Sequence, residues 1–109
     1  MPMQKIGHMS LKNDGGFVAR IQIAYLDDDG YRQMSRQSDD VTLGASRSVE
    51  PSSLGVPDGS ICYLSAFVVW GTDNTAGQAF YYDKGNSNSA NYSISGTTLS
   101  NDLGLIGIS

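Results

Sequence analysis

Hydrophobic and polar positions alternate with a period of two along much of the chain. In residues 17–26, one alternating set is wholly apolar, while Arg20 and Gln22 fall in the other set. This pattern predicts a strand with one face in a core and one facing water. Residues 60–70 form the longest apolar run, with no charge and with both alternating sets apolar. We therefore predict a central strand there that is buried on both faces.

Turn-forming residues separate these two segments from shorter candidate strands. Gly and Asp gather at residues 13–16, 27–30, 51–59 and 71–77, where they favour turns and loops, the paired Gly15 and Gly16 through a positive φ. The remaining candidate strands are residues 5–11, 31–36, 41–43, 47–49, 78–83, 92–95 and 103–108. About eight short strands without a long helix predict an all-β, immunoglobulin-like antiparallel β-sandwich, with residues 1–109 forming a single domain.

Charge narrows the set of expected partners. The formal net charge is −4, and the seven Lys and Arg residues are scattered singly. A nucleic-acid-binding protein usually has a basic face, and binding to anionic lipid by charge alone needs one too. We expect no nucleic-acid partner. No apolar amino-terminal segment resembles a signal peptide and no run reaches membrane-spanning length, so we expect a soluble chain whose export would follow a non-classical route.

Candidate catalytic and metal-binding residues are few. Cys62 is the only cysteine, which excludes an internal disulfide, and its place in the central strand predicts a buried, unreactive thiol. His8 is the only histidine, and a solvated or edge-strand position is favoured over a metal ligand or general base. The Asp residues lie mostly in turns, which disfavours a glycosidase pair. We expect no enzyme activity, no cofactor and no metal.

Two segments resemble a known family. Residues 15–25 read Gly-Gly-Phe-Val-Ala-Arg-Ile-Gln-Ile-Ala-Tyr, and residues 96–99 read Gly-Thr-Thr-Leu. In this order they resemble the opening strand and the last loop of the carboxy-terminal domain of thiol-activated, cholesterol-dependent cytolysins, and of small single-domain crystal-protein-like toxins. The resemblance extends over about residues 5–103 and implies a β-sandwich that contacts membranes through loop tips at one end.

The resemblance also implies which residues make this contact. Thr98 and Leu99 correspond to a pair that recognises cholesterol, since a hydroxyl can hydrogen-bond the sterol hydroxyl while a leucine enters the apolar layer. Further loop-tip contacts would come from Gly15, Gly16, Trp70, Gly71 and Thr72. The chain departs from the family in two places: one tryptophan stands in the loop that is normally tryptophan-rich, and Ser95 precedes the Gly-Thr-Thr-Leu loop in place of a tryptophan. We do not expect pore formation by this chain alone.

The same residues have simpler interpretations. Thr98 and Leu99 suit a strand end, and core packing is favoured for Trp70 over a membrane or sugar platform. Cross-strand pairing is favoured for Tyr81, Tyr82 and Tyr92, although an exposed one beside the Asn/Ser-rich residues 84–91 would suit a sugar.

Three functions stay open. The first is a non-catalytic, toxin-like module that binds a membrane lipid or sterol. The second is a lectin-like module that binds a cell-surface glycan, and the third is a structural β-sandwich that assembles as a homo-oligomer through its strand edges.

Overall fold

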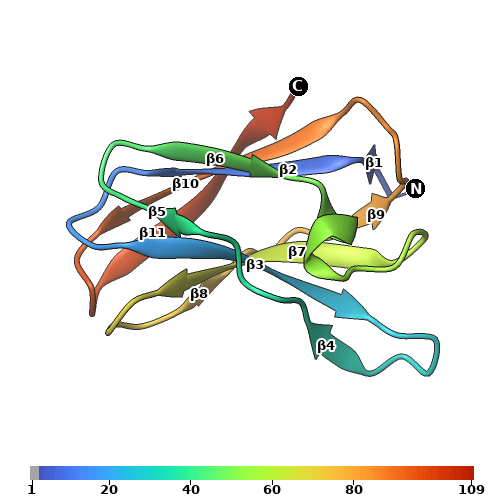
Figure 1. The fold of residues 1–109 in the computed structure, drawn as a ribbon, viewed down its shortest axis with the longest axis horizontal. Coiled ribbons are helices and arrows are strands. Elements are labelled where there is room, and N and C mark those ends of the chain that lie inside the picture. Colours follow the sequence, from blue (N-terminus) through green and yellow to red (C-terminus); the bar gives the residue numbers. More distant parts are fainter. Residues whose placement is uncertain (1–2) are drawn as a thin grey trace.

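Two β-sheets pack face to face in the computed structural model, which describes residues 3–109 (Figure 1). The seven-stranded sheet has the order β1-β9-β7-β3-β4, with β5 paired to β3 and β8 to β7; the four-stranded sheet has the order β11-β10-β2-β6. The elements are β1 (Lys5–Ile6), β2 (His8–Asn13), β3 (Ala19–Leu26), β4 (Arg32–Met34), β5 (Asp40–Val41), β6 (Ser46–Val49), the 3₁₀ turn η1 (Pro51–Leu54), β7 (Ile61–Val68), β8 (Asn74–Thr75), β9 (Phe80–Tyr82), β10 (Ser89–Gly96) and β11 (Asn101–Ile108). The predicted all-β sandwich is confirmed.

The antiparallel arrangement was predicted wrongly in part, because both sheets are mixed. β1 runs parallel to β9, and β2 runs parallel to β10. The chain passes from one sheet to the other at Gly7, where a Cβ would collide with the Asn86 carbonyl, and both Gly7 N and His8 N donate to the carbonyl of Asn88. Two segments about 80 residues apart thus cross between the sheets side by side. Local alternation contains no signal for such a distant pairing.

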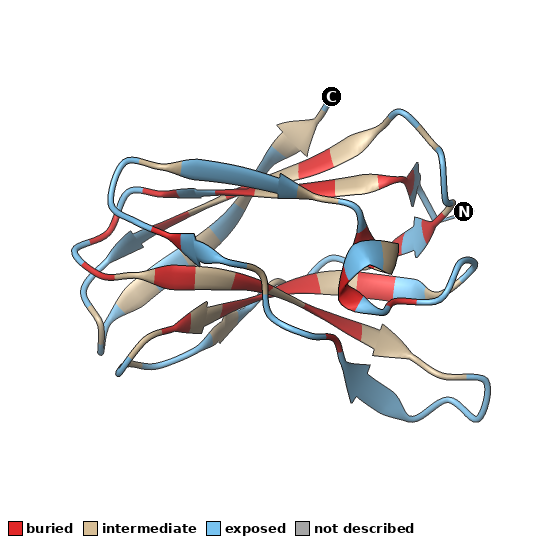
Figure 2. Cartoon of the chain, viewed as in Figure 1, coloured by how far each residue is buried: buried red, intermediate tan, exposed pale blue. Residues whose placement is uncertain are grey.

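Inward-pointing side chains of both sheets fill the core, drawn red in Figure 2. The predicted inward set of the second strand is buried, from Phe17 and Ala19 to Ile21 and Ile23. Cys62 is also fully buried, as predicted. Alternation therefore identified the core-facing side of β3.

Burial of β7 on both faces was a wrong prediction. Cys62, Leu64, Ala66 and Val68 point inward and are buried, whereas Ile61, Tyr63 and Phe67 on the other face are exposed or half-buried. Only Ser65 on that face is also buried. The difference arises because no third layer formed by residues 3–109 covers the outer face of the seven-stranded sheet, so these apolar side chains remain next to water.

Core packing of Trp70 was also a wrong prediction. β7 ends at Val68, and the Trp70 side chain is 96% exposed at a left-handed φ of 59°. Gly71 N donates to Val68 O at 3.1 Å, which closes a tight turn and directs the tryptophan away from the sheet. The position of a strand's last residue depends on this turn, which the apolar pattern does not reveal.

Two smaller differences between prediction and structure concern His8 and the start of β10. His8 opens β2, which lies between β10 and β6, so the edge-strand interpretation is wrong and its side chain is half-buried. β10 begins at Ser89, inside the segment expected to be a loop.

No helix formed by residues 3–109 has the length and apolar character needed to cross a membrane.

Candidate functional site

Four loops meet at one end of the sandwich, at the left of Figure 1. They join β2 to β3 (residues 14–18), β5 to β6 (42–45), β7 to β8 (69–73) and β10 to β11 (97–100). Three of them contain the residues that the sequence singled out.

Backbone hydrogen bonds join the three predicted loops. Gly16 N donates to Gly96 O at 3.0 Å, and Thr72 N donates to Thr98 O at 2.8 Å. Asn101 Nδ2 donates to Thr72 O at 2.8 Å. The loops therefore form one connected end, and each fixes the position of its neighbour.

Asn13 holds the β2–β3 turn. Its side chain is fully buried, donates from Nδ2 to Phe17 O and Val41 O at 2.6 and 2.9 Å, and accepts from Gly15 N at 2.9 Å. Neither Gly15 nor Gly16 has a positive φ, so the left-handed turn expected there is wrong. Gly15 is instead required because a Cβ would collide with the Phe17 ring.

Gly71 allows the β7–β8 and β10–β11 loops to approach each other. A Cβ at this position would collide with the Thr98 carbonyl oxygen and with the Val68 side chain. Asp73 supports the turn by accepting a hydrogen bond from Val68 N at 2.9 Å. Trp70 is consequently displayed at the tip of a loop whose two sides are both fixed.

The β10–β11 loop displays Leu99. The turn is closed by Thr97 N donating to Ser100 O at 2.8 Å, and Gly96 begins it with a φ of 103°. Leu99 is 76% exposed and does not cap the core, while Thr98 is half-buried against the neighbouring loop. The strand-end interpretation of this pair is therefore wrong.

Sequence reasoning missed Leu43. It was assigned to a short strand, but it lies in the β5–β6 loop with its side chain 66% exposed. The loop is anchored by Gly44 N, which donates to Asn13 O at 2.7 Å. A leucine directly before a glycine, between turn-forming residues, was the available signal. We refer to Leu43, Trp70 and Leu99 as the apolar tips.

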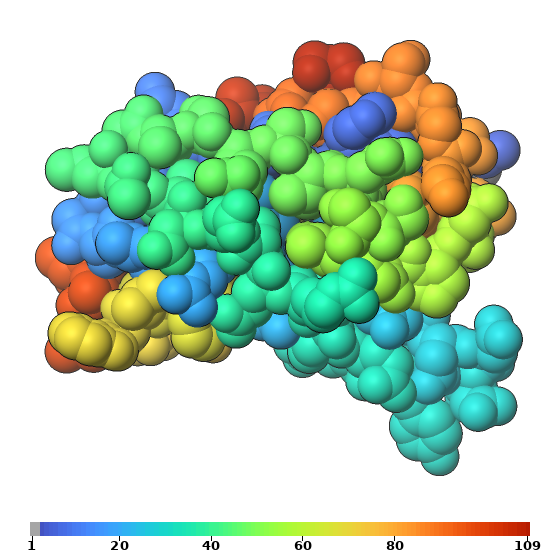
Figure 3. Space-filling model, in the orientation of Figure 1, coloured from blue at the N-terminus to red at the C-terminus, as the bar shows by residue number. Residues whose placement is uncertain are grey.

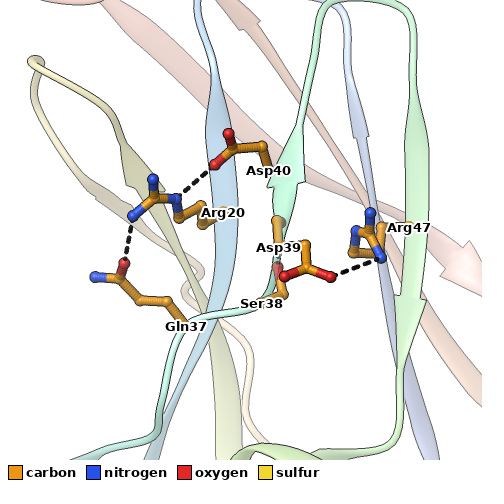
Figure 4. A pocket seen from close by; sticks show the side chains of 6 residues that line it. All are labelled: Arg20, Gln37, Ser38, Asp39, Asp40 and Arg47. Atoms are coloured by element: carbon orange, nitrogen blue, oxygen red, sulfur yellow. Dashed lines mark hydrogen bonds and ion pairs between the residues drawn. The ribbon is translucent and has the colours of Figure 1, made fainter.

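A polar hollow lies beside this end, lined by Arg20, Gln37, Ser38, Asp39, Asp40 and Arg47 (Figure 4). Arg20 Nε donates to Asp40 Oδ1 at 2.7 Å and Arg20 Nη1 to Gln37 Oε1 at 3.2 Å, and Arg47 pairs with Asp39 at 3.8 Å. Its charges are thus matched within the hollow. It contains no nucleophile positioned next to a base.

Shifted pKa values lie elsewhere in the molecule. Burial raises the pKa of Cys62 to about 12, and burial followed by the nearby Cys62 raises that of Tyr92. Hydrogen bonds from the Gln33 side chain and the Tyr31 backbone lower the pKa of Asp27 in the exposed β3–β4 turn. The two core groups stay protonated at neutral pH. Within residues 3–109, no three His, Cys, Asp or Glu side chains lie together as metal ligands would.

Solved structures share this architecture. A crystal structure of a gram-negative toxin aligns with a TM-score of 0.50 and 17% identity, covering 92% of this chain and 22% of that one. Listeriolysin O aligns with a TM-score of 0.49 and 18% identity, covering 91% and 22% of the two chains, and suilysin from Streptococcus suis with 0.49 and 16%, covering 93% and 23%. The fold resembles that of cytolysins.

This cytolysin-like fold covers less than a quarter of the length of those toxins. At such low identity, the alignments establish the fold alone. No protein-family model and no curated protein matched the sequence. Support for any particular function must therefore come from the geometry of the loops.

Proposed function

We propose that the chain is a non-catalytic, toxin-like recognition module that binds a membrane component through the apolar tips. One observation carries the proposal: three large apolar side chains are exposed at the same end, on three different loops. Exposed apolar groups gathered in this way mark interaction sites rather than ordinary surface.

The chemistry of the apolar tips suits the surface of a bilayer. A tryptophan has an apolar body and a polar N–H, and it partitions to the membrane–water interface. Burying a leucine side chain is worth about 1.5–3 kcal/mol. Three such groups together support reversible association in which the loops enter the interface and the sandwich stays outside.

The loops are preorganised for this contact. The bonds from Thr72 to Thr98 and from Gly16 to Gly96 fix the loops before any ligand arrives, which lowers the entropy lost on binding. The net charge of −4 gives little attraction to anionic lipid. Association should therefore depend on apolar insertion and only weakly on salt.

Sterol recognition is the more specific part of the proposal. The resemblance assigns it to Thr98 and Leu99, and the structure contributes an exposed leucine beside a threonine whose backbone carbonyl already has a partner. The threonine hydroxyl would hydrogen-bond the sterol hydroxyl while Leu99 enters the apolar layer.

The test is sedimentation with phosphatidylcholine liposomes that contain or lack cholesterol. The Thr98→Gly, Leu99→Gly double variant should lose sterol-dependent association, after circular dichroism has confirmed its fold. Ile106→Ala is the matched control, because this exposed apolar residue lies on β11 outside the loops and its loss should have no effect. Equal sedimentation of wild type and double variant with sterol liposomes would refute sterol recognition by this pair.

Glycan binding is the second candidate function. Of the three tyrosines near the Asn/Ser-rich segment, Tyr82 and Tyr92 are buried and Tyr81 is exposed. Asn88 Nδ2 donates to Lys5 O, on the strand paired with that of Tyr81. A glycan array with wild type and Tyr81→Ala tests this alternative: a glycan signal that the variant loses would support it, and an array without signal would refute it.

A further inference from the structure

The seven-stranded sheet has an outer face, opposite the core, whose composition is unusual for a surface. The strand registers align Lys5 with Tyr81, and Tyr81 with Ile61, across β1, β9 and β7. They also align Tyr63 with Ala24 across β7 and β3, and Ala24 with Met34 across β3 and β4. Apolar and aromatic side chains therefore cross the sheet from edge to edge.

A cation lies over each aromatic ring of this face. The pairs are Lys5 Nζ over Tyr81 at 5.8 Å, Arg20 Cζ over Phe67 at 5.8 Å and Arg32 Cζ over Tyr63 at 5.9 Å. Tyr81 is 38% exposed and Met34 is exposed as well. Aromatic residues, Met and Arg are the types enriched where proteins bind each other.

Three cations lie on the outer face, although the chain as a whole is acidic. The chain has seven Lys and Arg and eleven Asp and Glu. Lys5, Arg20 and Arg32 each lie over a ring of this face, and Arg20 is paired with the Asp40 carboxylate. Within residues 3–109, Lys5 and Arg32 form no ion pair, so their charges are available to a partner.

The complementary feature is the turn between β3 and β4. This hairpin projects beyond the rest of the molecule at the lower right of Figure 3. Asp28 and Asp29 are exposed at its tip, and Tyr31 is 70% exposed beside them. We refer to Asp28, Asp29 and Tyr31 as the acidic tip.

Asp27 makes the acidic tip rigid. Its Oδ1 accepts from Asp29 N at 3.0 Å and from Tyr31 N at 2.9 Å, and its Oδ2 accepts from Gln33 Nε2 at 3.0 Å. The turn thus keeps its shape before it meets a partner, which reduces the entropic cost of binding. Asp28 and Asp29 remain free to meet cations.

We propose that the outer face binds the acidic tip of a second copy of this chain. Asp28 and Asp29 meet Lys5 and Arg32 of the neighbouring copy, and Tyr31 packs on its exposed aromatic side chains. The contact joins two different surfaces, so a pair of copies keeps one free face and one free tip, and the association can continue in one direction.

This contact leaves the proposed membrane surface open. In Figure 1 the hairpin lies at the lower right, whereas the loops with the apolar tips lie at the left. The inference therefore goes beyond the proposed function and stands independently of it. Variants of the acidic tip should associate with liposomes as wild type does, whatever their effect on assembly.

Charge reversal on each surface tests the contact by sedimentation velocity across a concentration series. We expect wild type to associate, and high salt to weaken the association. The tip variant, Asp28→Lys with Asp29→Lys, and the face variant, Lys5→Glu with Arg32→Glu, should each associate at least about tenfold more weakly, because like charges then face each other. An equimolar mixture of the two variants should associate again, since an intact tip meets an intact face.

The control is Glu50→Lys with Asp102→Lys, which changes the net charge as the tip variant does, but at exposed residues away from both surfaces, and should associate as wild type does. Tyr31→Ala, a change at an exposed turn, should weaken association without charge reversal. Wild type that stays monomeric throughout, a tip variant that associates normally, or a mixture of folded variants that stays monomeric would each overturn the proposal.

Discussion

Trp70 illustrates how small neighbours decide the exposure of a large side chain. It is the only tryptophan, yet it lies outside the core because the chain turns at Gly71. The close approach to Thr98 leaves no room for a Cβ at that glycine. At the scale of single residues, the candidate site thus depends on Gly71 as much as on its exposed apolar side chains.

Gly71→Ala should destabilise the protein by about 1–3 kcal/mol, because the added methyl group forces the β7–β8 and β10–β11 loops apart. The same change should weaken liposome association. Gly77→Ala is the control, since a Cβ there meets nothing within 4 Å. Urea unfolding of both variants makes the comparison, and an equal free energy of unfolding for the two would contradict the role given to Gly71.

Cys62 should make the fold sensitive to alkali. Its folded pKa of about 12 lies above its ordinary value of 9.0, so between these pH values the unfolded chain loses a proton that the folded chain keeps. Stability is therefore fully present below about pH 9 and falls as the pH rises, by up to about 1.4 kcal/mol per pH unit. Tyr92, whose pKa is also raised, adds a similar loss above pH 10.

Urea unfolding of wild type and Cys62→Ala between pH 8 and 11 measures this effect, and the variant should show the shallower decline. In the same account, thiol reagents label Cys62 only after denaturation. Parallel declines for the two proteins, or rapid labelling of the folded protein, would contradict the burial of this thiol.

The two faces of β7 show what a strand pattern can predict. Alternation predicted the strand but did not single out its inward set, because both alternating sets are apolar. It could not show that the other set faces water, because Tyr63 and Phe67 are apolar for a different reason: they pack beside the side chains of Arg32 and Arg20. An apolar run therefore predicts a strand, but not the number of layers around it.

Leu64→Ala should cost about 2–5 kcal/mol of unfolding free energy, because it removes buried atoms and leaves a cavity. Ile61→Ala on the outer face of the same strand should cost clearly less, since Ile61 is already 36% exposed. Chemical denaturation of both variants tests the difference. Similar losses would indicate that β7 is covered on both faces.

At the scale of the whole molecule, the sequence predicted the fold class and three of the four loops that meet at one end. The resemblance placed Thr98, Leu99 and the glycine turns together, and the hydrogen bonds between these loops agree with it. The sequence could not predict the parallel pairs between chain ends, since pairing over about 80 residues leaves no local pattern. It also missed Leu43, whose loop was assigned to a strand.

The central claim is that the apolar tips enter a membrane. Trp70 makes this directly measurable, because it is the only tryptophan and its side chain is almost fully exposed. Its fluorescence therefore reports on the candidate site without any label.

The measurement is the emission of Trp70 and its quenching by acrylamide as phosphatidylcholine–cholesterol vesicles are added. The free protein should emit as a water-exposed tryptophan does and be strongly quenched. With vesicles, the emission should shift to shorter wavelength and the quenching should fall, and Leu43→Ala with Leu99→Ala should weaken both changes. Emission and quenching that stay constant while the protein sediments with the vesicles would contradict the account, as would the absence of any association.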